Sequence, residues 1–175
     1  GSVPNDDSYA INKDGQALVV RNTTIAAYQV EKDSLLFQET LFNFYRPLPP
    51  LPGSKYDPRA IYDPEADRFI VVYLSGNTYQ TSKVVVGFSR SANPGDGFYM
   101  YQLEGNPLQD STCSDYPHIS LSKQDLFITV NTFYNGSVNN SGYVQSTIRQ
   151  LDKSAGYDSL PLQEHYYSQL RYNGE

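Results

Sequence analysis

Tyr56–Gly76 reads YDPRAIYDPEADRFIVVYLSG and contains the signals of a complete β-hairpin. Asp57–Ile61 opens the segment, and Glu65–Asp67 forms a short polar stretch after it. Arg68–Leu74 then supplies a run of Phe, Ile, Val and Tyr, residue types that favour strands. A polar turn between two such runs is typical of a hairpin. We therefore predict two antiparallel strands in this stretch.

The same pattern occurs three times along the chain. An opening Asp is followed by four residues of a strand, then by a polar turn and a second strand. The openers are DSYAI from Asp7, DPRAI from Asp57 and DYPHI from Asp115; the turns are Asp14–Gly15, Glu65–Asp67 and Lys123–Asp125; the second strands are Gln16–Asn22, Arg68–Leu74 and Leu126–Phe133. A recurrence of this kind indicates a repeat architecture.

Each unit continues with two further predicted strands. In the middle unit they are Lys83–Ser89 and Phe98–Leu103, separated by the Gly-, Pro- and Asn-containing turn Ser91–Gly97. The corresponding predictions in the outer units are Thr24–Val30, Ser34–Leu41, and Tyr143–Asp152 followed by a weaker tail. The pattern predicts four antiparallel strands per unit and almost no helix.

Four-stranded units repeated at this spacing favour an all-β fold of the β-propeller class, with about three blades of a larger ring of roughly six to eight. A Greek-key β-sandwich is the alternative, but it gives no reason for the opening Asp to recur. We expect blade 1 in residues 1–45, a connector and blade 2 in residues 46–108, and blade 3 with the start of the next connection in residues 109–175. The exposed flanks of such an arc would need the remainder of the propeller, or a second polypeptide, to cover them.

Composition narrows the classes of partner. The 175 residues carry a net charge of −6 and no Lys/Arg-rich run, which argues against nucleic acid and anionic membranes as partners. No apolar run approaches the length of a membrane-spanning helix. One cysteine excludes an internal disulfide and a multi-cysteine metal site.

Four segments together resemble a family of secreted or cell-surface bacterial β-propellers that open blades with a DPxxxYDxxADR signature, typical of type IX secretion cargo. They are Tyr56–Gly76, Val84–Pro107, Ser114–Asn131 and Ile148–Tyr157. The resemblance implies an extracellular or cell-surface location and a longer parent protein. It implies no reaction, because the family is poorly defined in function.

The three opening carboxylates, Asp7, Asp57 and Asp115, are expected at equivalent places at the start of each innermost strand. Two interpretations are open. Convergent carboxylates would supply the oxygen ligands of Ca²⁺ or another hard cation. Alternatively each Asp accepts backbone N–H groups of its own turn, which the lack of a DxDxDG loop favours. Asp6 and Asp63 are secondary candidates.

Arg68, Tyr116 and His118 are the candidate ligand-binding residues. Arg68 would pair with a carboxylate of a neighbouring blade or clamp a substrate carboxylate. Tyr116 and His118 belong to a predicted inner strand, where a hydrogen-bonded structural role near the channel is the simpler interpretation of His118. Cys113 precedes them, but we expect its side chain, Asp115 and His118 to alternate faces of the strand, which argues against a nucleophile–base pair.

These observations favour a secreted binding or scaffolding module that recognises a glycan or protein ligand, and no catalytic residue is assigned. The alternatives are a polysaccharide hydrolase whose acid and base come partly from other blades, and a chain held by a secretion or surface-assembly partner.

Overall fold

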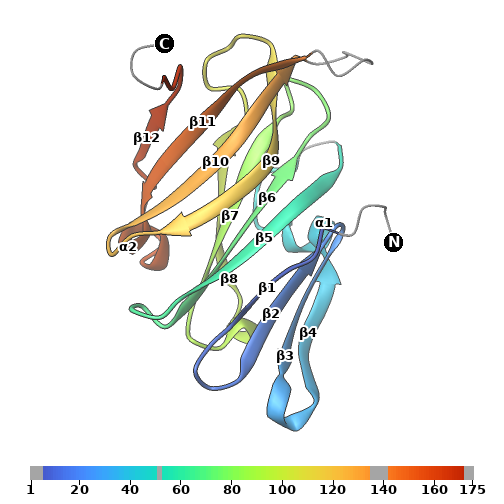
Figure 1. Ribbon diagram of the computed structural model, residues 1–175. Coiled ribbons are helices and arrows are strands. Elements are labelled where there is room, and N and C mark those ends of the chain that lie inside the picture. Colours follow the sequence, from blue (N-terminus) through green and yellow to red (C-terminus); the bar gives the residue numbers. More distant parts are fainter. Residues whose placement is uncertain (1–5, 51–52, 135–141, 172–175) are drawn as a thin grey trace.

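The computed structural model describes residues 6–50, 53–134 and 142–171, and within these ranges the chain folds into three four-stranded antiparallel sheets (Figure 1). The first sheet contains β1 (Ser8–Ile11), β2 (Gln16–Arg21), β3 (Thr24–Gln29) and β4 (Ser34–Thr40). The second contains β5 (Lys55–Asp63), β6 (Arg68–Ser75), β7 (Lys83–Ser89) and β8 (Phe98–Glu104). The third contains β9 (Thr112–Leu121), β10 (Asp125–Tyr134), β11 (Tyr143–Asp152) and β12 (Glu164–Tyr167).

In every sheet the strands lie in sequence order, so each strand pairs with the next one along the chain. The all-β prediction and the prediction of four strands per unit are therefore confirmed. The weak tail of the third unit forms the short edge strand β12, which pairs with β11 from Ile148 to Leu151.

Helical structure is confined to short connections. α1 (Leu41–Phe44) and α2 (Lys153–Tyr157) are the α-helices of the described residues, and Val30–Lys32 (η1) and Pro94–Asp96 (η2) form 3-10 turns. Thr40 caps α1 by accepting the N–H of Asn43, and Asp152 caps α2 by accepting the N–H of Ser154. No helix of the described residues has the length and apolar character needed to cross a membrane.

The second sheet is buried on both faces. Along β6, the side chains of Phe69, Val71 and Tyr73 belong to the core shared with the first sheet. Those of Ile70, Val72 and Leu74 belong to the core shared with the third sheet. All six are fully buried. Each fully buried side chain of this kind contributes ~1.5–3 kcal/mol. Because both faces of β6 are covered, its sequence is a continuous apolar run instead of an alternating one.

The first strand of each sheet packs against the first strand of the next. β5 contacts β1 on one side and β9 on the other, and Figure 1 shows it lying between them. α1 adds Leu41 and Phe44 to the core between the first two sheets. α2 packs against β7 and closes one end of the second interface.

Both outer sheet faces carry apolar side chains. On the first sheet, Tyr9 and Ile11 are 75% and 50% exposed, and they pair with Val19 and Ala17 on the same face. The corresponding face of the third sheet carries Phe127 and Phe133 together with Thr129 and Asn131 on β10. The first sheet therefore exposes an apolar outer face, and the outer face of the third sheet mixes apolar and polar residues.

Candidate functional site

The repeat is carried by a left-handed residue in, or just before, the first strand of each sheet. Asp6, Asp57 and Tyr116 have φ values of 45°, 50° and 54°. Regular pairing with the second strand begins or resumes two residues later in every sheet, at Ser8–Val20, Arg59–Val72 and His118–Thr129. By backbone geometry these three residues occupy equivalent positions.

This equivalence corrects the sequence alignment of the opening Asp residues. Asp7 and Asp115 were expected to correspond to Asp57, but the structural counterparts of Asp57 are Asp6 and Tyr116. A shift of one residue along a strand exchanges its two faces. The sequence repeat was thus placed one residue out of register in the first and third units.

Asn22 links the first two units at this level. Its side-chain amide donates to Asp6 Oδ2 at 2.6 Å, and its Oδ1 accepts the backbone N–H of Asp57 at 2.7 Å. A turn residue of the first sheet is therefore hydrogen-bonded both to Asp6, just before β1, and to Asp57 in β5. No sequence pattern points to this role of Asn22, because the role depends on contacts between sheets.

Two of the three predicted carboxylates do come together. The carboxyl groups of Asp57 and Asp115 lie close enough to influence each other, and the Tyr116 N–H donates to Asp115 Oδ1 at 2.9 Å. Burial raises the pKa of Asp57 to about 6, and the nearby carboxyl of Asp115 adds to the effect. Two neighbouring carboxyl groups resist ionising together, so Asp57 keeps its proton to a higher pH than an isolated aspartate does.

Asp7 stays apart from this pair. It is exposed and lies 3.9 Å from Arg21 Nε on β2. Among residues 6–50, 53–134 and 142–171 no three His, Cys, Asp or Glu side chains are grouped closely enough to hold a metal ion. Asp7, Asp57 and Asp115 consequently do not form a three-carboxylate cation site within this part of the chain.

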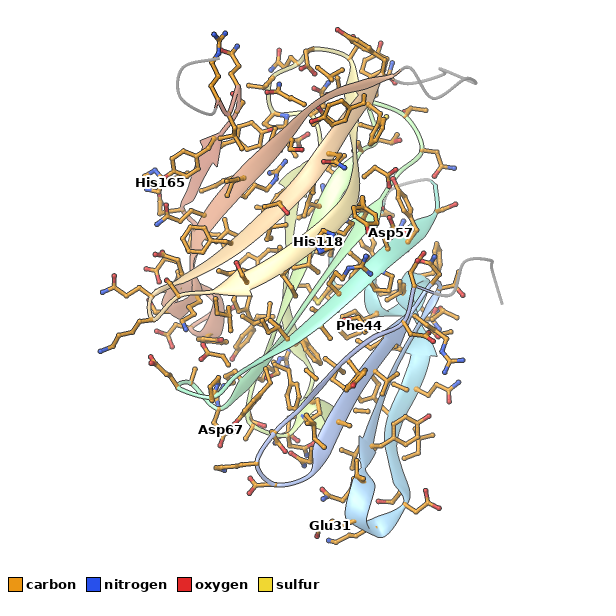
Figure 2. All side chains as sticks on the ribbon, in the orientation of Figure 1. Glu31, Phe44, Asp57, Asp67, His118 and His165 are labelled. Carbon is orange, nitrogen blue, oxygen red and sulfur yellow. The ribbon has the colours of Figure 1, made fainter. Side chains whose placement is uncertain are left out.

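Tyr116 and His118 form an exposed cluster beside the carboxyl pair. Their rings meet edge to face with centroids 4.8 Å apart, and the Arg59 guanidinium lies 5.9 Å from the Tyr116 ring. Arg59 Nε also donates to the Pro117 carbonyl at 3.0 Å, which fixes β5 to β9. Figure 2 shows His118 and Asp57 on these neighbouring strands. An aromatic ring, an imidazole, a guanidinium and carboxyl groups thus share one surface of the first strands.

Arg68 lies elsewhere. Its backbone lies opposite that of Asp63 in the β5–β6 hairpin, at the other end of β5 from Asp57. Its Nη1 donates to the carbonyls of Ala66 and Asp67. The expected ion pair between Arg68 and a neighbouring unit is therefore absent from the described part of the chain.

Other residues make the ion pairs between sheets. Lys13 of the first sheet lies 3.0 Å from Asp67 Oδ2, and Lys153 of the third lies 2.7 Å from Asp63 Oδ2. The Lys13–Asp67 pair is solvent-exposed and contributes little stability. The Lys153–Asp63 pair is buried, so Asp63, a secondary candidate from the sequence, has a structural partner.

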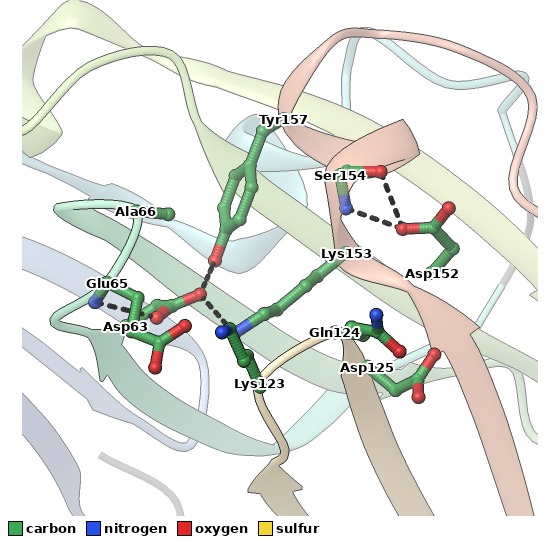
Figure 3. A pocket seen from close by; sticks show the side chains of 10 residues that line it. All are labelled: Asp63, Glu65, Ala66, Lys123, Gln124, Asp125, Asp152, Lys153, Ser154 and Tyr157. Carbon is green, nitrogen blue, oxygen red and sulfur yellow. Dashed lines mark hydrogen bonds and ion pairs between the residues drawn. The ribbon is translucent and has the colours of Figure 1, made fainter.

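A cleft of about 570 Å³ opens above this buried pair, at the boundary of the second and third sheets (Figure 3). It is formed by the β5–β6 turn, the β9–β10 turn and α2. Its lining residues are Asp63, Glu65, Ala66, Lys123, Gln124, Asp125, Asp152, Lys153, Ser154 and Tyr157. The volume lies within the range of small-molecule sites.

Hydrogen bonds fix the floor of the cleft. Asp63 accepts the Glu65 N–H, the Tyr157 hydroxyl at 2.8 Å and the Lys153 ammonium. Burial by itself would raise the pKa of Asp63, but the hydrogen bonds from Lys153 and Tyr157 outweigh it and lower that pKa. Asp63 is therefore held as a carboxylate, and Tyr157 is held as a donor.

Cys113, Asp115 and His118 lie on one face of the third sheet, contrary to the expected alternation. They pair with Phe133, Asn131 and Thr129, which are alternate residues of β10. The irregularity at Tyr116 inserts an extra residue and restores His118 to this face. Burial, together with the Asp115 carboxylate, raises the pKa of the Cys113 thiol. The thiol is therefore less ionised than an exposed one, which is the opposite of an activated nucleophile.

Comparison with protein-family models, with curated proteins and with solved structures finds no match to this chain.

Proposed function

We propose that this chain is a contiguous arc of a larger β-propeller, outside the cell or at its surface, that works as a binding or scaffolding module. Its ligand, a glycan or a protein segment, meets the surface of the first strands. The observation that carries the proposal is the succession β1–β5–β9, in which the first strand of each sheet packs on the first strand of the next. This is the relation between innermost strands of adjacent propeller blades.

The repeated left-handed residue supports the same reading. Asp6, Asp57 and Tyr116 hold equivalent left-handed positions, and hydrogen bonds connect successive units beside them, from the Asp57 N–H to Asn22 and from Arg59 to Pro117. A sandwich of two facing sheets offers no reason for three equivalent strand openings. In the propeller proposal these residues surround one end of the central axis.

The outer faces support an arc that is incomplete by itself. The first sheet exposes Tyr9, Ile11 and Leu35, each at least half exposed, where the second sheet packs its corresponding face against the first sheet. Exposed apolar surface of this kind marks an interaction site. The partner we propose is a further blade, supplied by the rest of the propeller or by a second polypeptide.

The ligand surface is proposed from the cluster on β5 and β9. Tyr116 is 54% exposed although its backbone N–H is fixed by a hydrogen bond to the Asp115 carboxyl group. A rigid exposed ring beside a guanidinium and an imidazole provides stacking and hydrogen bonding at little entropic cost. The location outside the cell follows from the resemblance of Tyr56–Gly76 and the three other segments to secreted propellers.

Assembly is tested by native mass spectrometry of the protein from its source, with and without a chelator. We expect a longer chain or a second polypeptide that remains bound. A stable monomer of 175 residues would contradict the propeller arc. Loss of the mass of one cation on adding the chelator would show that the assembly also binds a metal ion.

Ligand recognition is tested on glycan and peptide arrays. We expect bound spots to disappear with the double variant Tyr116→Ala/His118→Ala and to persist with Tyr134→Ala, which removes a ring of the same 54% exposure from the end of β10. Equal loss in both variants, or no bound spot for the unaltered chain, would contradict a ligand surface at Tyr116.

A further inference from the structure

The cleft between the second and third sheets is separate from the Tyr116 surface, because it lies at the opposite end of β5. Its floor consists of Asp63 and Lys153, which are 1% and 5% exposed. Figure 3 shows Lys153 extending from α2 across the cleft to Asp63. Its ammonium donates to Asp63 Oδ2 at 2.7 Å and to the Ser122 carbonyl at 2.9 Å. An ammonium has three hydrogens, so one donor remains for a ligand.

Both donors and acceptors surround this floor. Lys123 and Gln124 add an ammonium and an amide from the β9–β10 turn, and Glu65 adds a carboxylate from the β5–β6 turn. Asp125 uses Oδ2 to accept from Gln150 Nε2 at 3.0 Å, and Asp152 uses Oδ1 to cap α2. Each of these two carboxylates retains a second oxygen.

We propose that this cleft binds a neutral, polyhydroxylated ligand of the sugar class. A hydroxyl group both donates and accepts, so it is matched by a lining in which ammonium, amide and carboxylate groups alternate. An anion would meet Glu65, Asp125 and Asp152, and a cation would lie near the ammonium groups of Lys123 and Lys153; because the lining holds more carboxylates than ammonium groups, the cationic probe is the stricter comparison. Ala66 and the ring of Tyr157 provide apolar surface for the C–H groups of the sugar.

The cleft is preorganised for such a ligand. Tyr157 packs edge to face on Phe88 with centroids 5.3 Å apart, and its hydroxyl is fixed by Asp63. Because Lys153, Tyr157 and Asp63 are already ordered, binding would not have to immobilise them. The exposed Glu65 and Lys123 then select among sugars by the hydroxyl groups they reach.

The test is an NMR titration of the isotopically labelled chain with glucose, galactose, mannose, xylose and N-acetylglucosamine at millimolar concentrations. Nα-acetyl-lysine amide serves as the cationic comparison probe, and citrate serves as the anionic one. We expect saturable shifts for a neutral sugar at the amides of Glu65, Ala66, Gln124 and Ser154. The variant Glu65→Ala/Lys123→Ala should weaken that binding at least about 10-fold, the effect of losing about 1.4 kcal/mol. The matched variant Glu31→Ala/Lys32→Ala changes an exposed acid–base pair at the far tip of the first sheet and should leave the affinity unchanged.

Several results would overturn the proposal: no shifts at the lining residues with any neutral sugar, shifts only with a charged probe, or equal weakening in both variants. Spectra of the variants show directly that they are folded. Tyr116→Ala/His118→Ala should keep this sugar binding, so failure here and failure of the Tyr116 surface are distinguishable.

Discussion

The Lys153 ammonium of α2 lies 2.7 Å from the Asp63 carboxylate at the end of β5, across the boundary between the second and third sheets. Both side chains are almost completely buried, and Asp63 additionally accepts the Tyr157 hydroxyl. Removing two charges from water is costly, so the pair persists only because each charge is neutralised and hydrogen-bonded by the other. The contact fixes α2 to the second sheet and makes the floor of the cleft.

Substituting one partner of this pair should be strongly destabilising. Asp63→Asn leaves the Lys153 ammonium buried without a counter-charge, and we expect a loss of ~3–5 kcal/mol in the free energy of unfolding. Lys153→Met should cost a similar amount, whereas the double variant should lose clearly less than the sum. Urea unfolding of the four proteins measures this coupling. Strictly additive losses would show that the two groups do not depend on each other.

Asp57 should make the stability depend on pH in a defined direction. Its pKa of about 6 lies above the ordinary value of 3.8, so the folded chain binds a proton more tightly than the unfolded chain. The associated stability is present below pH ~4 and is lost as the pH rises through about 6. Because Asp57 is half exposed, we expect a loss on the order of 1 kcal/mol.

Asp57→Asn should flatten this loss between pH 4.5 and pH 7.5, because an amide does not titrate. Thermal unfolding at the two pH values provides the measurement, with Asp33→Asn as control, since Asp33 is exposed and also left-handed, at φ 45°. If Asp57→Asn retained the full pH dependence of the unaltered chain, the proton would reside on other groups.

Gly156 is required at the contact between α2 and the second sheet. A Cβ at this position would lie 2.4 Å from Cε2 of Phe88, a ring fixed in the core. Gly156→Ala should therefore force α2 outward and cost ~1–3 kcal/mol by overpacking. The comparison variant is Gly95→Ala, whose Cβ meets only the movable side chain of Asn93. Chemical unfolding should separate the two, and similar losses would contradict a steric role for Gly156.

Neighbouring residues of β2 should respond oppositely to the same substitution. Leu18→Lys places a charge in the core between the first two sheets and should prevent folding, because Leu18 is fully buried. Val19→Lys changes the outer face and should leave the isolated chain folded, with a loss of no more than ~1 kcal/mol.

Circular dichroism and unfolding curves test the folded state, and binding of a hydrophobic dye tests the outer face. Dye binding should fall with Val19→Lys if this face is the exposed apolar surface. In the proposed larger propeller the same variant should weaken the contact with the next blade. Unfolding of the isolated Val19→Lys chain would mean that the outer face is needed within the chain itself.

The sequence determined the strands and their grouping. Runs such as Arg68–Leu74 and Lys83–Ser89 contain β-branched and aromatic residues bounded by turn residues, which is local information. The structure places β6 and β7 on these runs and gives four strands to each sheet. The continuous apolar character of β6 also follows from the sequence, because a sheet covered on both faces has no polar side.

The register of the repeat and the partners of the charged residues were decided by tertiary structure. The sequence aligned Asp57 with Asp7 and Asp115, whereas the backbone aligns it with Asp6 and Tyr116. An Asp stands at all three positions of the sequence alignment, but at only two of the three structurally equivalent positions. A one-residue irregularity in the strand determines which face each side chain occupies. Local propensity contains no information on that irregularity.

The same limit applies to the cleft. Lys153 and Asp63 are distant in the chain, and neither belongs to a recognisable motif. Their pairing became favourable only when packing of α2 on the second sheet removed both from water and left each as the other's available counter-charge. Side-chain electrostatics depends on distance and burial in three dimensions, and both are set by sheet packing after the strands have been specified.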